Sequence, residues 1–266
     1  MIDDVKVGTD SEIFLQHKLS GEIVSAEGII KGTKEEPFQF RPEKSPFFAT
    51  SLDNVMAEFN IPPVDSAIDF YLNTQYAINY IKSILPAELC TCIMPAAKIS
   101  EQYLQTDNAK LFGCEKDYNV WMDVENPPPV PVENLRSCGG HVHVSYKEPN
   151  PYISALIIKA LDIYLGVPSV IQEPDNQRKL LYGKAGAHRM KSYGCEYRTI
   201  SNYYLTSKDL TMWVYDQVMQ AVRFINEGGF FNFPSDTEQR IQDCINFNKK
   251  DTAYSLMKQF NIKLAA

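Results

Sequence analysis

Two histidines, His141 and His143, lie two positions apart within Ser137-Cys-Gly-Gly-His-Val-His-Val-Ser-Tyr146. If this stretch is a β-strand, both imidazoles lie on one face, and the valines pack on the other. The two preceding glycines have no Cβ atom, so a ligand or another backbone segment can approach closely. The pattern favours a functional site. The alternative is two hydrogen-bonded histidines on a half-exposed strand, because a bare His-x-His is a weak motif.

Three further stretches place polar side chains on one face of a predicted strand. They carry Asp10 with Glu12, Glu58 with Asn60 on a strand from Leu52 to Ile61, and Glu196 with Arg198. With the histidine pair, they predict one sheet with a polar concave face and helices on its other face. Carboxylates gathered this closely resist ionisation unless cations neutralise them. Carboxylates with one imidazole suit Mg²⁺ or Mn²⁺.

A basic segment precedes the last of these strands. It holds Arg178, Lys179, Lys184, Arg189 and Lys191, with glycines at 183 and 186. We expect a mobile cationic loop that closes over phosphate groups; a solvated surface is the alternative. The chain contains neither GxxxxGK[ST] nor GxGxxG, so the common nucleotide-binding folds are not supported. The residues therefore predict an ATP–metal site without a Walker motif.

The remaining elements predict one α+β domain over residues 1–266. Helices are expected from Asp65 to about 85, from Asn150 to about 166, and over the C-terminal part from about 207. Residues 112–136 form a long irregular stretch with three consecutive prolines, Pro127 to Pro129. Loops of this length often act as lids or binding loops. We expect this one to flank the mouth of the site.

Composition excludes some classes of protein. The chain has 266 residues and a net charge of −7, with no long Lys/Arg run, which argues against binding to duplex nucleic acid. Residues 152–170 are apolar but are interrupted by Lys159, Asp162 and Pro168, so no membrane span is expected. The N-terminus lacks the pattern of a signal peptide. Six scattered cysteines read as reduced thiols of a cytoplasmic protein.

At this point the sequence resembles a known family. The order Gly8-Thr-Asp-Ser-Glu12, Gly139-Gly-His-Val-His143 and Gly194-Cys-Glu-Tyr-Arg198 is similar to that of the phage-type COOH–NH2 ligase type 2 amidoligases. The resemblance extends to Phe112-Gly-Cys114 with Asp117-Tyr-Asn119, and to Tyr182-Gly-Lys-Ala-Gly186 with Arg189. It covers roughly residues 5 to 205.

The resemblance implies a curved antiparallel sheet with helices packed on one face, as in a glutamine synthetase-like catalytic domain. It also implies roles for individual side chains. The implied metal ligands are Asp10, Glu12, Glu58, His141 and Glu196. The residues implied to contact nucleotide are His143, Arg178, Arg189 and Lys191. The residues expected to act in catalysis are Arg189 and Arg198 on the transferring group, and Asp117 as a base.

The expected function is ATP-dependent ligation of a carboxylate to an amine through an acyl phosphate, with Mg²⁺ or Mn²⁺. The substrates would be small molecules or peptides, oligomers are possible, and a phage-encoded protein would act in the host cytoplasm. Three alternatives stay open: a phosphotransferase of the same fold, a non-catalytic nucleotide-binding protein, and a zinc hydrolase using both histidines. Amide formation, ATP binding without turnover, and ATP-independent activity lost on zinc chelation would distinguish them.

Overall fold

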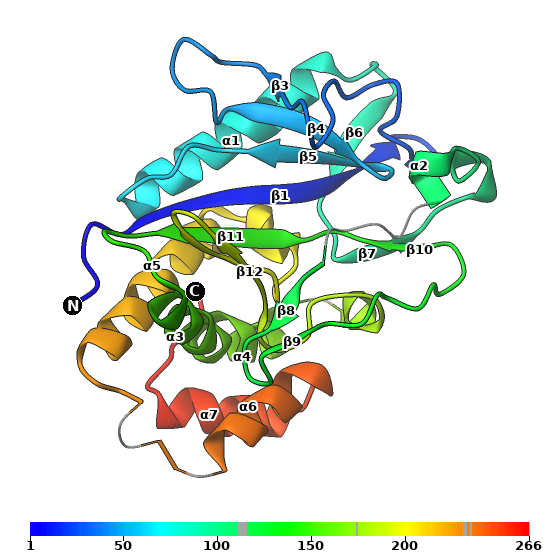
Figure 1. Ribbon diagram of the computed structural model, residues 1–266. Helices are drawn as coiled ribbons and strands as arrows, with labels where there is room; N and C mark the ends of the chain where they lie inside the picture. Colours follow the sequence, from blue (N-terminus) through cyan, green and yellow to red (C-terminus); the bar gives the residue numbers. More distant parts are fainter. Residues whose placement is uncertain (111–115, 174, 231–232, 235, 266) are drawn as a thin grey trace.

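A computed structural model describes residues 1–110, 116–173, 175–230, 233–234 and 236–265 (Figure 1). The predicted motif Phe112-Gly-Cys114 lies outside the described residues. Mixed α and β structure surrounds a large antiparallel sheet whose strands run in the order β3-β4-β5-β1-β11-β13-β12-β8-β9. This confirms the predicted α+β class and the predicted antiparallel sheet.

The long strand β1 (Lys6–His17) is central to this sheet. It pairs along its first part with β5 and β11, and along its last part with β2 and β6. The other strands are β2 (Ile23–Val24), β3 (Phe38–Gln39), β4 (Ala49–Asp53), β5 (Met56–Asn60), β6 (Leu89–Cys92), β8 (Tyr118–Asn119), β9 (Val124–Glu125), β11 (Gly140–Ser145), β12 (Ala187–Lys191) and β13 (Gly194–Tyr197). A separate two-stranded sheet joins β7 (Ala96–Lys98) to β10 (Leu135–Ser137).

Helices cover one face of the sheet, with a further pair outside them (Figure 1). The main helices are α1 (Ala67–Ile84), α3 (Pro151–Leu161), α4 (Val167–Gln172), α5 (Lys208–Asn226), α6 (Thr237–Asn246) and α7 (Lys250–Gln259). Short helical segments are α2 (Asp107–Lys110), η1 (Glu101–Tyr103), η3 (Gln177–Leu180) and η4 (Asn202–Thr206). Side chains of Asn150 and Ser207 cap α3 and α5, which satisfies backbone N–H groups that the first helical turn leaves without partners.

The alternation predicted for the histidine strand is confirmed. Val142 and Val144 are fully buried in the core that the helices share, while His141 and His143 lie on the opposite face of β11. Ile13 and Leu15 of β1 enter the same core. One face of the sheet therefore supplies stability through apolar burial, and the other is left for polar side chains.

The apolar helical segment Pro151–Gln172 runs through α3, a π-helical turn η2 (Asp162–Gly166) and α4. Its length and composition would suffice to cross a membrane, but 72% of its apolar window is buried inside the protein. It is placed as a core helix.

Two sequence-based predictions of local structure are wrong. The stretch from Leu52 to Ile61 is a hairpin rather than one strand, because Asn54 adopts φ +57° and turns the chain between β4 and β5. The basic segment 178–191 is not a continuous loop. It begins in the 3₁₀ helix η3 and ends as strand β12 within the main sheet.

Candidate active site

Strand register brings the predicted acidic and imidazole side chains onto one face of the sheet. Asp10 lies opposite His141 of β11, and Glu12 lies opposite Glu58 of β5. His143 in turn lies opposite Glu196 of β13. Directly opposed side chains in an antiparallel pair have Cβ atoms about 4.5–5.5 Å apart. Four chain segments that are distant in sequence thus place their polar groups in a row across the sheet.

The first cluster consists of Asp10, His141 and Glu196, whose possible ligand atoms all lie within 4.8 Å of one another. His141 Nδ1 is 3.1 Å from Asp10 Oδ1 and 3.8 Å from Glu196 Oε1. A Cβ atom on Gly139 would lie 2.2 Å from His141 Nε2, so glycine is required there for the imidazole to keep its position. This explains one of the two glycines that precede the histidine pair.

Three cations surround the carboxylate of Glu196, which is fully buried. Lys191 Nζ lies 2.8 Å from Glu196 Oε2, Arg189 Nη1 lies 3.7 Å from Oε1, and Arg198 Nη1 forms a close ion pair with Oε1. Burial and neighbouring Asp10 would raise the pKa of Glu196, but Arg198 and the two histidines outweigh them and hold it at about 2. Glu196 is therefore ionised at neutral pH.

The two histidines have opposite electrostatic environments. Burial and the positive charge of Arg198 lower the pKa of His141 to about 4, so its imidazole is neutral at pH 7. Neutral imidazole is the form that ligates metals. His143 lies between Asp10 Oδ1, 3.0 Å from its Nε2, and the Tyr193 hydroxyl, 2.5 Å from its Nδ1. Burial would lower the pKa of His143, but Asp10 outweighs it and raises this pKa.

Asp10 connects both histidines through one carboxylate oxygen. Burial alone would raise the pKa of Asp10, yet the charges of His143 and His141 hold it well below its usual range. The first cluster thus contains two ionised carboxylates and one neutral imidazole, which is a donor set for a hard divalent cation.

A second cluster consists of Glu12, Asp53 and Glu58, with ligand atoms again within 4.8 Å of one another. Burial and the nearby Asp53 carboxylate raise the pKa of Glu12 to about 8, although Gly139 N–H donates to Glu12 Oε2 over 2.6 Å. Burial and the neighbouring acids raise the pKa of Glu58 as well. Lys34 Nζ lies 2.8 Å from Asp53 Oδ1 and supplies one positive charge. Three crowded carboxylates with one lysine form a second set of donors that fits a divalent cation.

Asp53 is a candidate ligand that the interpretation of residues 52–61 as one strand does not identify, because it ends strand β4 of a hairpin. With Asn54 at the turn, Asp53 of β4 shares a face with Ser51, which lies opposite Glu58 and donates to Glu58 Oε1 over 3.2 Å. An Asp-Asn pair between two alternating segments is a turn signal. That signal was present in the sequence and would have identified the position.

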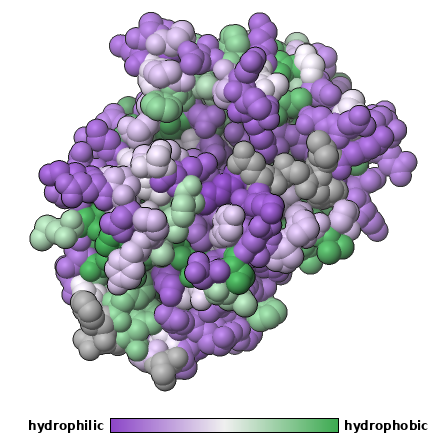
Figure 2. Space-filling view, viewed as in Figure 1, coloured by the Kyte–Doolittle hydropathy of each residue, from purple (hydrophilic) through white to green (hydrophobic). Residues whose placement is uncertain are grey.

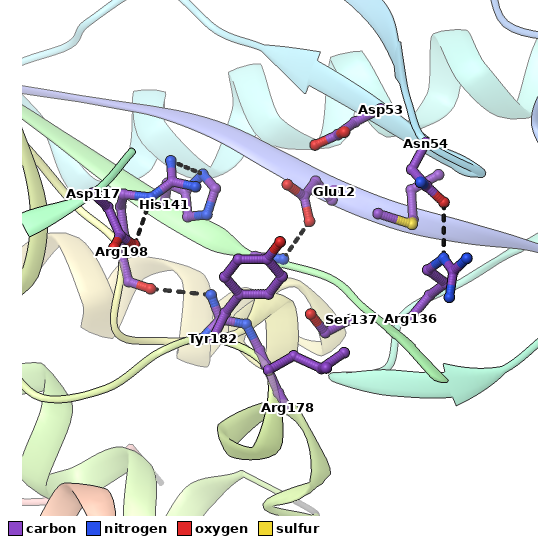
Figure 3. Close-up of a pocket in the computed structure, with 13 residues that line it drawn as sticks. Glu12, Asp53, Asn54, Asp117, Arg136, Ser137, His141, Arg178, Tyr182 and Arg198 are labelled. Carbon is purple, nitrogen blue, oxygen red and sulfur yellow. Dashed lines mark hydrogen bonds and ion pairs between the residues drawn. The ribbon is translucent and has the colours of Figure 1, made fainter. Parts of the chain in front are cut away.

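A pocket opens beside both clusters (Figure 3). Its lining includes Glu12, Asp53, His141, Asp117 and Arg198. Asp117 Oδ2 is 3.6 Å from Arg198 Nε, and Asn126 donates to Asp117 Oδ1 over 2.9 Å. We call this the inner pocket. Asp117 comes from the long loop expected to flank the site, and it borders this pocket.

Two buried arginines also border the inner pocket. Arg178 donates to the backbone carbonyls of Thr199 and Arg198, at 2.8 and 3.0 Å, and its side chain is almost fully buried. Arg136 donates to Asn54 Oδ1 over 3.0 Å and to Ala109 O over 2.7 Å. Arg178, predicted to contact nucleotide, thus lies at a different place from Arg189 and Lys191, which accompany Glu196.

A second pocket lies at the other end of the polar face. Its lining includes Gly8 of β1, His143 of β11 and the partly exposed rings of Phe47 and Tyr193. We call this the aromatic pocket. His143 borders it, as His141 borders the inner pocket, so the first cluster lies between the two spaces.

Comparisons with known proteins give matches among solved structures and to one family model. The sequence has no match among curated proteins. Among solved structures, one similar chain is titled "Crystal structure of a bifunctional glutathione synthetase from Pasteurella multocida", with a TM-score of 0.49 and 11% identity. The alignment covers 97% of this chain and 49% of that one, so the chain spans about half of that protein's length.

A family model matches part of the chain. Its description is "Phage phiEco32-like COOH.NH2 ligase-type 2", and the match covers residues 129–227. These residues contain β11, β12 and β13, and with them His141, Arg189, Glu196 and Arg198. The resemblance read from the sequence is thereby confirmed: residues 129–227 match the model of a phage-type carboxylate–amine ligase family.

Proposed function

We propose that this protein is an ATP-dependent carboxylate–amine ligase that forms an amide through an acyl phosphate and uses Mg²⁺ or Mn²⁺. One observation carries the proposal: two carboxylate clusters lie side by side on one sheet face, with Arg189, Lys191 and Arg198 gathered at one of them. Clustered acids that fit divalent cations, next to fixed cations, are typical of sites for a triphosphate and its metals.

Strand β1 gives the proposed order of the ligands. Gly8, Asp10 and Glu12 project from the same face, and successive positions of this kind are about 6.6 Å apart. Gly8 borders the aromatic pocket, Asp10 belongs to the first cluster, and Glu12 belongs to the second and borders the inner pocket. The nucleotide base would occupy the aromatic pocket, the phosphates would cross the clusters, and the carboxylate substrate would occupy the inner pocket.

The residues of this chain would hold and neutralise the reacting groups. Asp10, His141 and Glu196 would hold one cation, and Glu12, Asp53 and Glu58 another. When bound, these cations would neutralise charge on the phosphates. Arg189 and Lys191 would contact phosphate oxygens, and His143 would contact nucleotide or substrate. Arg198 would face the γ-phosphoryl group as it moves to the carboxylate oxygen, where fixed positive charge stabilises the transition state.

In the second half-reaction the amine nitrogen would attack the acyl carbon, and phosphate would leave. The ammonium form of the amine must first lose a proton. Asp117 lies at the edge of the inner pocket and beside Arg198, so it is the carboxylate best placed to accept that proton.

We propose that residues 1–266 act as one amidoligase domain with a glutamine synthetase-like sheet. We also propose that the enzyme acts in the cytoplasm, and in the host cytoplasm when it is phage-encoded.

A zinc hydrolase that uses both histidines is less well supported. His143 already contacts Asp10 with one ring nitrogen and Tyr193 with the other.

The test is ADP release from ATP with Mg²⁺, measured against pools of carboxylates and amines, with mass spectrometry for a condensed product. A ligase gives ADP together with a product that has lost one water from the sum of both substrates. A phosphorylated product without an amide would identify a phosphotransferase instead. Glu196→Gln should abolish ADP release, and the exposed Glu88→Gln should not. ADP release unaffected by Glu196→Gln would contradict the proposed site.

A further inference from the structure

A second hollow lies next to the inner pocket. Asp117, Leu181 and Tyr182 border both spaces. The outer space lies between the proline run 127–129 and the segment that follows η3. We call it the outer groove. In Figure 3, the ring of Tyr182 lies among the side chains that line the inner pocket. A ligand in the outer groove would therefore lie next to the inner pocket.

Apolar side chains are exposed on both walls of the outer groove. Val130, after the proline run, is 76% exposed, and Leu180 on the opposite wall is 60% exposed. Hydrophilic residues cover most of the face seen in Figure 2, with smaller hydrophobic areas among them. Two apolar side chains that face one groove from opposite sides can bury a single apolar side chain of a ligand.

The proline wall also selects the polar groups of a ligand. Pro127, Pro128 and Pro129 have no backbone N–H, and three successive prolines favour the polyproline II conformation, which has no internal hydrogen bonds. This wall can offer backbone carbonyl oxygens but no donors. A ligand that lies against it must bring its own N–H groups, as an extended peptide does.

The opposite wall is held rigidly. Lys179 of η3 donates to Thr199 O over 3.0 Å and to the carbonyl of Gly183, and Arg178 donates to Thr199 O over 2.8 Å. Both side chains are buried. The segment that carries Leu180 is thus fixed to the chain that follows β13, next to Arg198. A wall fixed before binding reduces the ordering cost of binding an extended ligand.

One carboxylate lies at the inner end of the groove, where Asp117 Oδ2 is 3.6 Å from Arg198 Nε. Asp117 borders both spaces, whereas Lys116 of the groove is paired with Glu125 at 3.0 Å. We propose that the outer groove binds an extended, peptide-like chain whose terminal primary amine reaches Asp117. This inference rests on the proposed ligase function, since it identifies the amine substrate as the end of a chain rather than a free small amine.

Binding can be measured without turnover, by fluorescence anisotropy in the presence of Mg²⁺. The probes are hexapeptide libraries labelled at an amidated C-terminus, with either a free or an acetylated N-terminus, and unlabelled amino-acid amides as competitors. We expect the free-amine hexapeptides to bind at least about tenfold more tightly than the acetylated ones and than the amides. Equal affinity for hexapeptides and amino-acid amides would overturn the inference.

Substitutions in the outer groove test where the hexapeptides bind. Val130→Asp and Leu180→Asp should each weaken hexapeptide binding about tenfold. Leu19→Asp, at a surface position that is 94% exposed and outside the three spaces described, should bind as the unmodified protein does. Tight binding that survives both groove substitutions would also overturn the inference.

Parallel ADP-release assays separate the two proposals. Peptide binding at the groove without ADP release under any condition would contradict the ligase function and would still support the groove as a peptide-binding site. A second outcome is ADP release and amide formation with small amines, at rates that do not rise with peptide length. This outcome would support the ligase function and contradict the groove as a peptide site. Rates that rise with length up to six residues would support both.

Discussion

At the scale of single residues, the site is defined by how burial and neighbouring charge divide its carboxylates. Glu196 is held ionised with a pKa of about 2, because arginine and histidine charges outweigh its burial. Glu12, with similar burial, lies beside Asp53 and has a pKa of about 8. In the absence of metal, the first cluster is therefore charged, and the second holds protons that a cation would displace.

This difference predicts the effect of removing one acid from the second cluster. In metal-free buffer at pH 7.5, Glu12→Gln should raise the free energy of unfolding by roughly 1–3 kcal/mol, because a carboxylate that resists ionisation is replaced by a neutral group of the same shape. Added Mg²⁺ or Mn²⁺ should stabilise the unmodified protein and should stabilise the variant much less. Thermal melts with and without metal check both expectations.

The matched control is Glu88→Gln, which changes an exposed glutamate on the turn before β6. It should alter neither the metal-free melting temperature nor the shift caused by metal. A Glu12→Gln protein that is less stable than the unmodified one in metal-free buffer would show that the second cluster is not under electrostatic stress.

At the scale of elements, the turn between β10 and β11 positions the metal-binding imidazole. Gly139→Ala would place a Cβ atom 2.2 Å from His141 Nε2, so the ring must move. We expect turnover to fall at least about tenfold with the fold retained, as judged by circular dichroism. Both changes act through the same imidazole. Adding Gly139→Ala to a His141→Ala variant should therefore not lower turnover further, which a double-mutant cycle measures. Additive losses would contradict this.

The π-helical turn between α3 and α4 supplies a second prediction. Asp162 accepts hydrogen bonds from Trp121 Nε1 at 2.6 Å and from the Tyr197 hydroxyl at 2.8 Å, so it links the long loop, the core helix and β13. Burial outweighs these donors and raises the pKa of Asp162 to about 6. Since the folded state then binds a proton more tightly than the unfolded state, this residue's contribution to stability is largest at low pH.

As pH rises from about 4 to 6, that contribution should decline by up to about 3 kcal/mol. Asp162→Asn should be less stable at pH 5 because an amide accepts fewer hydrogen bonds. The difference between the two proteins should then shrink between pH 4 and pH 6. Urea unfolding at several pH values measures this difference. A difference that grows with pH over this window would reverse the assigned sign.

At the scale of the whole molecule, the polar face of the sheet carries the two carboxylate clusters and borders the aromatic pocket and the inner pocket. The aromatic pocket and the inner pocket are bordered by different histidines of one strand, and the outer groove shares lining residues with the inner pocket and not with the aromatic pocket. The proposed function therefore separates nucleotide and amine at opposite ends. Substitutions at one end should affect one substrate and leave the other unaffected.

Phe47→Ala should raise KM for ATP about tenfold, because it removes one ring of the aromatic pocket, and should leave KM for the amine unchanged. Tyr182→Ala, at the junction of the inner pocket and the outer groove, should have the converse effect. Steady-state kinetics with each substrate varied in turn provide the measurement. Equal effects of both variants on both substrates would contradict the separation.

The sequence by itself determined which side chains share a face. Period-two alternation is a local property of a strand, so the pairing of His141 with His143 and of Glu196 with Arg198 could be read without knowing any partner strand. The helix starts near Asn150 and residue 207 are equally local, and the structure has them as expected.

Only the tertiary structure decided how these faces meet. The register of β1 against β5 and β11 divides the predicted ligands into two clusters, and the hairpin turn at Asn54 adds Asp53 to one of them. Arg178 and Lys179, read as mobile cations, are instead buried donors to backbone carbonyls. Register, burial and the continuity of pockets depend on contacts between residues far apart in the chain, which local patterns do not encode.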